Sequence, residues 1–162
     1  HFEAADASLE LLMRAASGWS HDYFTLESFS VNVGHRSGSG SRAWNDVAVQ
    51  VETEATVKVH VGGERVVATG EGNGPVNALD SALRKALGDR FPELERLHLT
   101  DFKVRVLEAR QGTGAVTRVL IDTTNGERTW TTIGVSENII EASWQALVDS
   151  LVFGILHTDD QA

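Results

Sequence analysis

An internal duplication constrains the fold of this chain more than any other feature. Three segments of the first half recur, in the same order, in the second half. The matched pairs are LESFSVNV (26–33) with LTDFKVRV (99–106), GGER (62–65) with NGER (125–128), and NALDSAL (77–83) with EASWQAL (141–147). The separations are 73, 63 and 64 residues, so the first copy carries the longer loop. Two copies of one structural unit are therefore predicted.

Each copy reads as three strands followed by one helix. Alternating apolar and polar residues indicate strands, and apolar residues three and four apart indicate helices. The predicted strands are 24–33, 47–61, 64–72, 97–107, 115–122 and 127–134, and the predicted helices are 75–87 and 138–156. Gly62-Gly63 and Asn125-Gly126 are typical of hairpin turns. The Gly/Ser-rich stretch 34–42 is predicted to be a mobile loop.

The predicted fold class is α+β. It consists of two pseudo-symmetric βββα units, each an antiparallel three-stranded sheet covered by a helix. A short helix at 3–16 precedes them. We expect residues 1–20 to be a linker helix and 21–162 one domain, with repeats at about 24–88 and 97–156. Three strands under one helix leave apolar surface open, so we expect the two copies to pack together.

Composition excludes several classes of function. The 162 residues include 14 basic and 23 acidic side chains, a net charge of −9, which argues against a nucleic-acid binder. No apolar run is long enough for a membrane span, and the first residues do not resemble a signal peptide. There is no cysteine, which is compatible with the cytoplasm, our expected location. Because residue 1 is His, we expect a piece of a longer protein.

The segment GEGNGPVNALD (70–80) is the most informative motif, because three glycines stand between a strand and a helix. Glycine lets a ligand approach the backbone, and a helix N-terminus favours an anion. A tight turn without a ligand and a site for a small carboxylate both fit. The G-x-G-x-G spacing disfavours a dinucleotide site, and no Gly-Lys-Ser/Thr follows as in a P-loop.

Other chemistry is poorly supported. The six histidines form no H-x-H or H-x-x-x-H pair, so no metal site is predicted, and no G-x-S-x-G nucleophile motif occurs. We expect no catalytic residue in this chain, and a ligand-sensing or assembly domain fits better than an enzyme. In the second copy, Ser136 is predicted to cap its helix. The tryptophans at 19, 44, 130 and 144 are predicted to be core or interface residues.

The chain resembles the C-terminal regulatory domain of the 2-isopropylmalate and citramalate synthases, and citramalate synthases more closely. The resemblance covers nearly all 162 residues and rests on EAADAS, GNGPVNALDSALRKAL, LTDFKVRVL, GTGAVTRVLI and TTIGVSENIIEASWQALVDSL. It implies a homodimer that binds a branched-chain amino acid, isoleucine or leucine, as feedback inhibitor. It also implies a catalytic barrel domain elsewhere in the parent chain, using a divalent metal and acetyl-CoA. No cofactor is implied for this fragment, and no nucleic acid or membrane partner.

The resemblance also implies an effector site. Its residues are Gly72, Asn73, Gly74, Pro75, Val76, Asn77, Leu99, Asp101, Phe102, Val106, Ala115, Val116 and Thr117. The glycine turn would approach the amino acid's main-chain groups, and the later residues would wall its aliphatic side chain. Relatives often have an acidic residue at position 77 and Tyr at position 102. Asn77 and Phe102 therefore keep open a dimerisation-only domain with a degenerate pocket, and Asp101 is a candidate partner for the ammonium group.

Overall fold

The computed structural model describes residues 5–36, 50–108 and 114–158, and these fall into two compact units. One unit is Thr25–Leu87, and the other joins the segment ending at Phe24 to the segment starting at Gly88. Each unit contains one predicted βββα repeat, so the α+β prediction is confirmed. Trp44 and most of the predicted loop at 34–42 lie outside the described residues.

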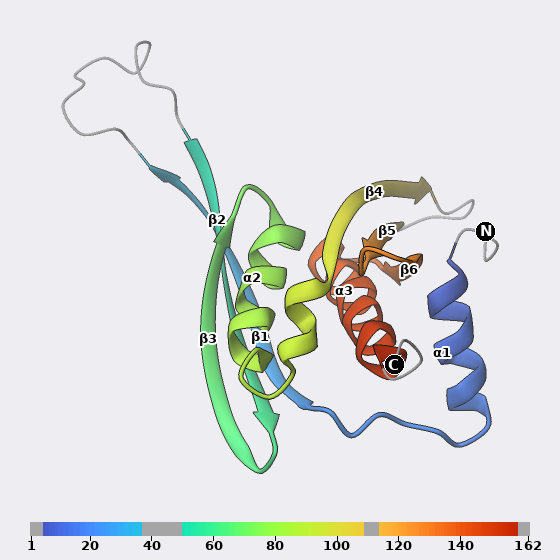
Figure 1. Ribbon diagram of the computed structural model, residues 1–162. Helices are drawn as coiled ribbons and strands as arrows, with labels where there is room; N and C mark the ends of the chain where they lie inside the picture. Colours follow the sequence, from blue (N-terminus) through green and yellow to red (C-terminus); the bar gives the residue numbers. More distant parts are fainter. Residues whose placement is uncertain (1–4, 37–49, 109–113, 159–162) are drawn as a thin grey trace, which may run out of the picture. The chain divides into compact units, whose positions relative to one another are not determined.

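The first unit is a sheet with one helix across it (Figure 1). Its elements are β1 (Thr25–Arg36), β2 (Gln50–Val61), β3 (Glu64–Gly72) and α2 (Pro75–Leu87). The strands pair antiparallel in chain order, and β2 to β3 turns at Gly62 and Gly63, both with positive φ. Alternate residues of β2, including Val57 and Val59, are fully buried on the face that α2 covers. The alternation that predicted the strand therefore also marks its core face.

The second unit repeats this arrangement. Its elements are β4 (His98–Glu108), β5 (Ala115–Thr124), β6 (Thr129–Ser136) and α3 (Ile139–Leu156). A short 3₁₀ helix, Pro92–Arg96, precedes β4 and was not predicted, because its sequence PELER is mostly charged and contains a single aliphatic residue. That residue, Leu94, anchors the 3₁₀ helix, since its side chain is buried.

The expectation that no apolar run is long enough for a membrane span is wrong for helix α3, which passes that test by length and composition alone, yet most of this helix is buried. This is the pattern of a core helix. Its interface with the sheet includes satisfied polar groups: Thr132 Oγ1 donates to the Ala146 carbonyl at 2.7 Å, and Trp130 Nε1 donates to the Ser150 carbonyl at 3.1 Å. Trp130 and Trp144 are buried, as predicted for core residues.

A glycine on the third strand brings each helix directly onto the backbone of its sheet. In the first unit, a Cβ on Gly70 would lie 2.8 Å from the Ala78 carbonyl oxygen. At the corresponding place in the second unit, a Cβ on Gly134 would lie 2.8 Å from the Ala142 carbonyl carbon and 3.0 Å from the Ala146 nitrogen. Real Cβ atoms almost never come this close to backbone. The duplication therefore preserves a packing device that only glycine fits.

Each helix covers the second and third strands of its sheet and leaves the helix-side face of the first strand open. In β1 this open row ends at Val33, whose exposed fraction is 62%. In β4 it runs along Phe102, Val104 and Val106, which are 47%, 39% and 62% exposed. Both units thus present an apolar row on their first strand.

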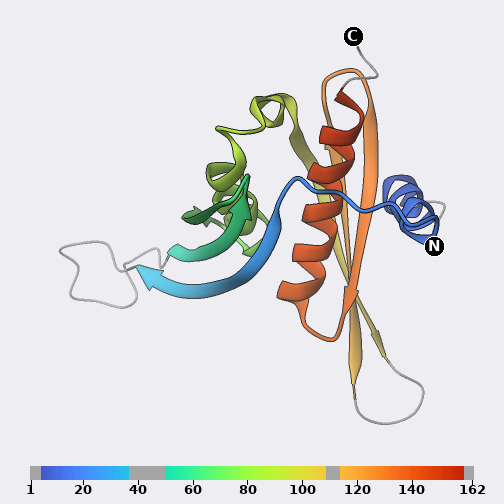
Figure 2. The same ribbon diagram turned by 90° about the horizontal axis from the view of Figure 1, so that it is seen from below.

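Helix α1 (Asp6–Ala16) lies beside β6, at the edge of the second sheet (Figure 2). Every second backbone N–H along this edge donates to a side chain: Thr131 to Asp6 Oδ1 at 3.0 Å, Ile133 to Ser8 Oγ at 2.9 Å, and Val135 to Gln145 Oε1 at 3.0 Å. Two of these acceptors belong to α1. The helix is thus fixed to the sheet edge by hydrogen bonds as well as by apolar contact.

The middle of α1 is fixed to the end of α3. Glu10 Oε2 and His157 Nε2 are 2.6 Å apart, and Arg14 lies one turn further along α1 at 3.3 Å from the same oxygen. Partial burial pushes the pKa of Glu10 upward, but the hydrogen bonds to His157 and Arg14 outweigh it and leave that pKa below its ordinary value.

Candidate functional site

The glycine-rich turn joins β3 to α2 in the first unit. Gly72 is the last residue of β3 and Pro75 is the first of α2, a position where proline's missing N–H costs nothing. Val76 is 3% exposed, so its side chain belongs to the core. Asn77 Nδ2 donates to Asn73 Oδ1 at 2.7 Å, which ties the first turn of the helix to the loop before it.

The two later glycines of this turn have different surroundings. A Cβ on Gly72 would lie 2.7 Å from the Asn77 Cβ and 2.8 Å from the Ala78 nitrogen, so Gly72 is needed by the turn itself. A Cβ on Gly74 would meet nothing within 4 Å, and the φ of Gly74 is not positive. Neither a positive φ nor a close contact requires a glycine at 74. The glycine leaves open space at the helix N-terminus.

The residue that matches Gly74 in the second unit is Asn138, and its side chain caps the helix. Asn138 is the N-cap of α3: its Oδ1 accepts from the N–H groups of Ile140 at 2.7 Å and Glu141 at 3.4 Å. The prediction that Ser136 caps this helix is wrong, because Ser136 Oγ instead accepts from the Asn138 N–H at 3.2 Å. The Asn138 carbonyl accepts from Ala142 N just as the Gly74 carbonyl accepts from Ala78 N.

The comparison of the two helix starts gives the candidate site its chemistry. By the same correspondence, Val76 and Asn77 match the two residues that Asn138 caps. No described residue places a side-chain acceptor on the N–H of Val76 or Asn77. Backbone N–H groups at a helix start favour an anion such as a carboxylate. In the sequence, this difference is found by aligning the two copies at a separation of 64 residues, which sets Gly74 against Asn138.

The other predicted effector residues lie in the second unit. The pairing of Phe102 with Ile121, and of Val106 with Thr117, puts both side chains on the helix side of the sheet. Leu99, Phe102, Val106, Ala115 and Thr117 share that face, whereas Asp101 and Val116 lie on the opposite face. The strand register thus brings five of these seven residues onto one side. Four of the five are at least partly accessible, and Thr117 is buried.

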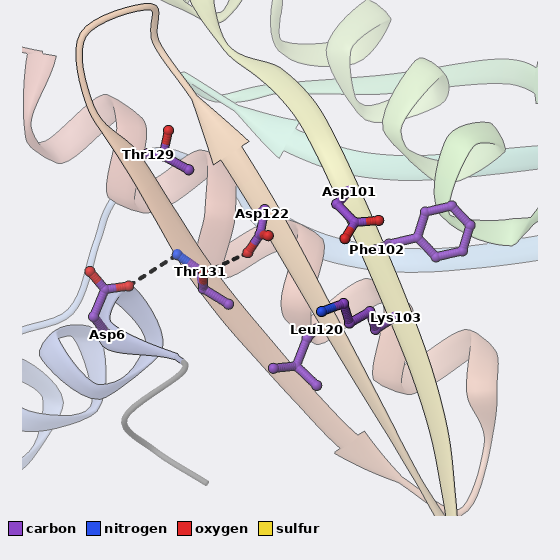
Figure 3. A pocket seen from close by; sticks show the side chains of 8 residues that line it. All are labelled: Asp6, Asp101, Phe102, Lys103, Leu120, Asp122, Thr129 and Thr131. Atoms are coloured by element: carbon purple, nitrogen blue, oxygen red, sulfur yellow. Dashed lines mark hydrogen bonds between the residues drawn. The ribbon is translucent and has the colours of Figure 1, made fainter.

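Asp101 lines a separate, open cavity of about 390 Å³ on the outer face of the second sheet (Figure 3). Asp101 lies opposite Asp122 across the β4–β5 pair. Asp122 Oδ1 accepts from Thr131 Oγ1 at 2.6 Å, and Lys103 lines the same cavity. The Phe102 ring extends beyond β4, away from Lys103 and Leu120 (Figure 3). Within the described part of the chain, no group of three His, Asp or Glu side chains is placed to hold a metal ion.

Two βββα units preceded by a helix define an α+β domain. The chain belongs to the family of the LeuA allosteric (dimerisation) domain, whose sequence pattern matches residues 3–153. The predicted resemblance to this group of synthases is confirmed.

Several similar proteins are citramalate synthases. The (R)-citramalate synthase of Streptomyces coelicolor is 53% identical over 96% of this chain, and that of Synechocystis sp. is 47% identical over 95%. A 2-isopropylmalate synthase of Pseudoalteromonas atlantica is 33% identical over 69% of this chain. The chain spans 27% of the length of each of the first two relatives.

Proposed function

We propose that this chain is the effector-binding domain of a citramalate synthase and that isoleucine is its effector. The carrying observation is the uncapped start of α2 at Gly74, set against the capped start of α3 at Asn138. A bound amino acid would place its carboxylate on the N–H groups of Val76 and Asn77, replacing the cap. The stronger similarity to citramalate synthases than to a 2-isopropylmalate synthase supports isoleucine over leucine.

We propose further that the domain is a homodimer. The exposed apolar row on β4, and the exposed Val33 on β1, support this, since exposed contiguous apolar side chains mark interaction surfaces. The parent protein would be an acyltransferase that joins acetyl-CoA to a 2-oxo acid on a separate, metal-dependent barrel domain. Inhibition would then require isoleucine to bind one conformational state of the parent better than another.

The test is to supply the missing cap. Gly74→Asn places the side chain of Asn138 at the matching position of the first unit, in open space and without positive φ. We expect the introduced amide side chain to occupy the N–H groups that the effector needs. Isoleucine affinity measured by titration calorimetry should fall about tenfold or more, since a hydrogen bond to a charged group contributes about 1.5–3 kcal/mol. The melting temperature should stay the same or rise slightly.

The matched control is Asn138→Gly, which removes the natural cap from the second unit. It should lower stability and leave isoleucine affinity unchanged. Tighter binding of leucine than isoleucine by the unsubstituted chain would assign this domain to a leucine-sensing 2-isopropylmalate synthase. Absence of saturable binding by any branched-chain amino acid would favour a dimerisation-only domain, an interpretation that the Asn77–Asn73 hydrogen bond also fits.

A further inference from the structure

A second candidate site lies in the second unit, around a carboxylate that the proposed function does not use. Asp149 stands on α3 and is half-buried. Its Oδ2 accepts a hydrogen bond from Ser8 Oγ at 2.9 Å. Burial raises the pKa of Asp149 to about 6, and the Ser8 hydrogen bond only partly opposes this. Among the described residues, no Lys, Arg or His forms an ion pair with it.

Asp149 lines a cavity of about 470 Å³ between α1, β6 and α3. The other walls are mainly aliphatic: Leu11, Leu12, Ala15, Ile133 and Val135. Leu12 is 58% exposed and Val135 is 46% exposed, so this part of the lining is open to solvent. The lining combines one carboxylate with mainly aliphatic side chains, which is the usual composition of a small-ligand site.

The polar groups beside Asp149 are already held in place. Ser8 Oγ accepts from the Ile133 N–H at 2.9 Å while its own hydrogen goes to Asp149, and Gln145 Oε1 accepts from the Val135 N–H at 3.0 Å. One carboxylate oxygen of Asp149 is thus occupied, and the other has no donor among the described residues. A single accepting oxygen suits an ammonium group better than a guanidinium, whose planar fork needs two.

We propose that this cavity binds a primary ammonium group carried on a short aliphatic chain. The Asp149 carboxylate binds the ammonium, and Leu11, Leu12 and Val135 pack against the chain. A cation here would pair with a half-buried carboxylate that has no charged partner among the described residues. This site is distinct from the proposed isoleucine site, because none of the residues that line it is among the predicted effector residues.

The experiment is a titration of the ¹⁵N-labelled chain with n-butylammonium chloride, monitored by the amide chemical shifts. A titration with sodium chloride at equal ionic strength is the control for salt effects. We expect saturable shifts at Ser8, Ile133 and Asp149. Asp149→Asn should weaken binding about tenfold or more, because it removes the charge. The variant keeps the acceptor for Ser8, so it retains the fold. The matched control is Asp80→Asn, which removes a buried carboxylate that already pairs with Arg84 at 2.8 Å.

Two outcomes overturn the proposal: no saturable shift at these amides, or equal butylammonium affinity in Asp149→Asn and the unsubstituted chain. Saturating isoleucine should leave butylammonium affinity unchanged, and competition between them would also overturn the independence of the two sites. Failure of the isoleucine titration alone leaves this result intact. A parallel titration with Nα-acetyl-lysine methylamide separates the sources: tighter binding than butylammonium assigns the site to a lysine of a protein partner, and weaker binding assigns it to a free amine.

Discussion

Gly134→Ala tests whether the glycine on β6 sets the distance between α3 and its sheet. The added methyl carbon would lie 2.8 Å from the Ala142 carbonyl carbon and 3.0 Å from the Ala146 nitrogen, and would press on the Ala142 carbonyl oxygen. These atoms belong to helical backbone, which yields less easily than the end of a side chain. Overpacking of a well-packed core costs about 1–3 kcal/mol and occasionally more, so we expect the upper end, about 3 kcal/mol.

For a domain of this size, a loss of about 3 kcal/mol corresponds to a melting temperature lower by roughly 6–12 °C. The assay is thermal unfolding followed by circular dichroism, with urea unfolding for the free energy. Gly70→Ala repeats the test in the first unit, where the Cβ would approach the Ala78 carbonyl. Gly74→Ala is the matched control, because its Cβ meets nothing within 4 Å, and only the poorer N-cap preference of alanine should lower its melting temperature, by less than in Gly134→Ala. If Gly134→Ala unfolds within a degree or so of Gly74→Ala, the close-packing argument is refuted.

Three further predictions concern side chains that the fold positions. The folded-state pKa of Asp149 is raised from 3.8 to about 6, so the contribution of Asp149 to the free energy of unfolding is complete below about pH 4 and is lost as the pH rises through 6. In urea unfolding at pH 7, Asp149→Asn should therefore be more stable than the unsubstituted chain by up to about 3 kcal/mol. A less stable variant would contradict this. Asn138→Ala should lower the free energy of unfolding by about 1 kcal/mol, whereas Ser136→Ala should cost less, and the reverse order would show that Ser136 is the effective cap. Ser8→Ala should speed hydrogen exchange at the Ile133 amide, because that N–H loses its acceptor, and unchanged exchange would refute the role given to Ser8.

Much of the fold is readable from the sequence because the signals are local and occur twice. The alternation of Phe29, Val31 and Val33 predicts a strand, and its register against β2 places these residues on the helix-side face. The turn at Asn125-Gly126 has the expected positive φ at Gly126. The 3₁₀ helix at Pro92–Arg96 was not predicted, since a single buried leucine gives no periodic pattern.

The candidate sites are less readable because their contacts are long-range. Ser8 and Asp149 are 141 residues apart, and neither stands in a recognisable motif. The glycine-rich turn was visible, but the difference between the open Gly74 and the required Gly72 depends on where the Asn77 and Ala78 atoms lie. The opposite faces of Asp101 and Phe102 are an exception, because the alternation of side chains along a strand is local and already separates two neighbours.

The hydrogen bonds along the outer edge of β6 also bear on aggregation. An unpaired strand edge is a template onto which another strand can add, and α1 removes that opportunity by filling two of the three N–H positions with Asp6 and Ser8. Proteolytic removal of the segment before β1 would leave those positions empty, beside the exposed Val135. Two such trimmed molecules would then be able to join β6 to β6 in one continuous sheet. The N-terminal helix therefore also protects the domain from edge-to-edge association.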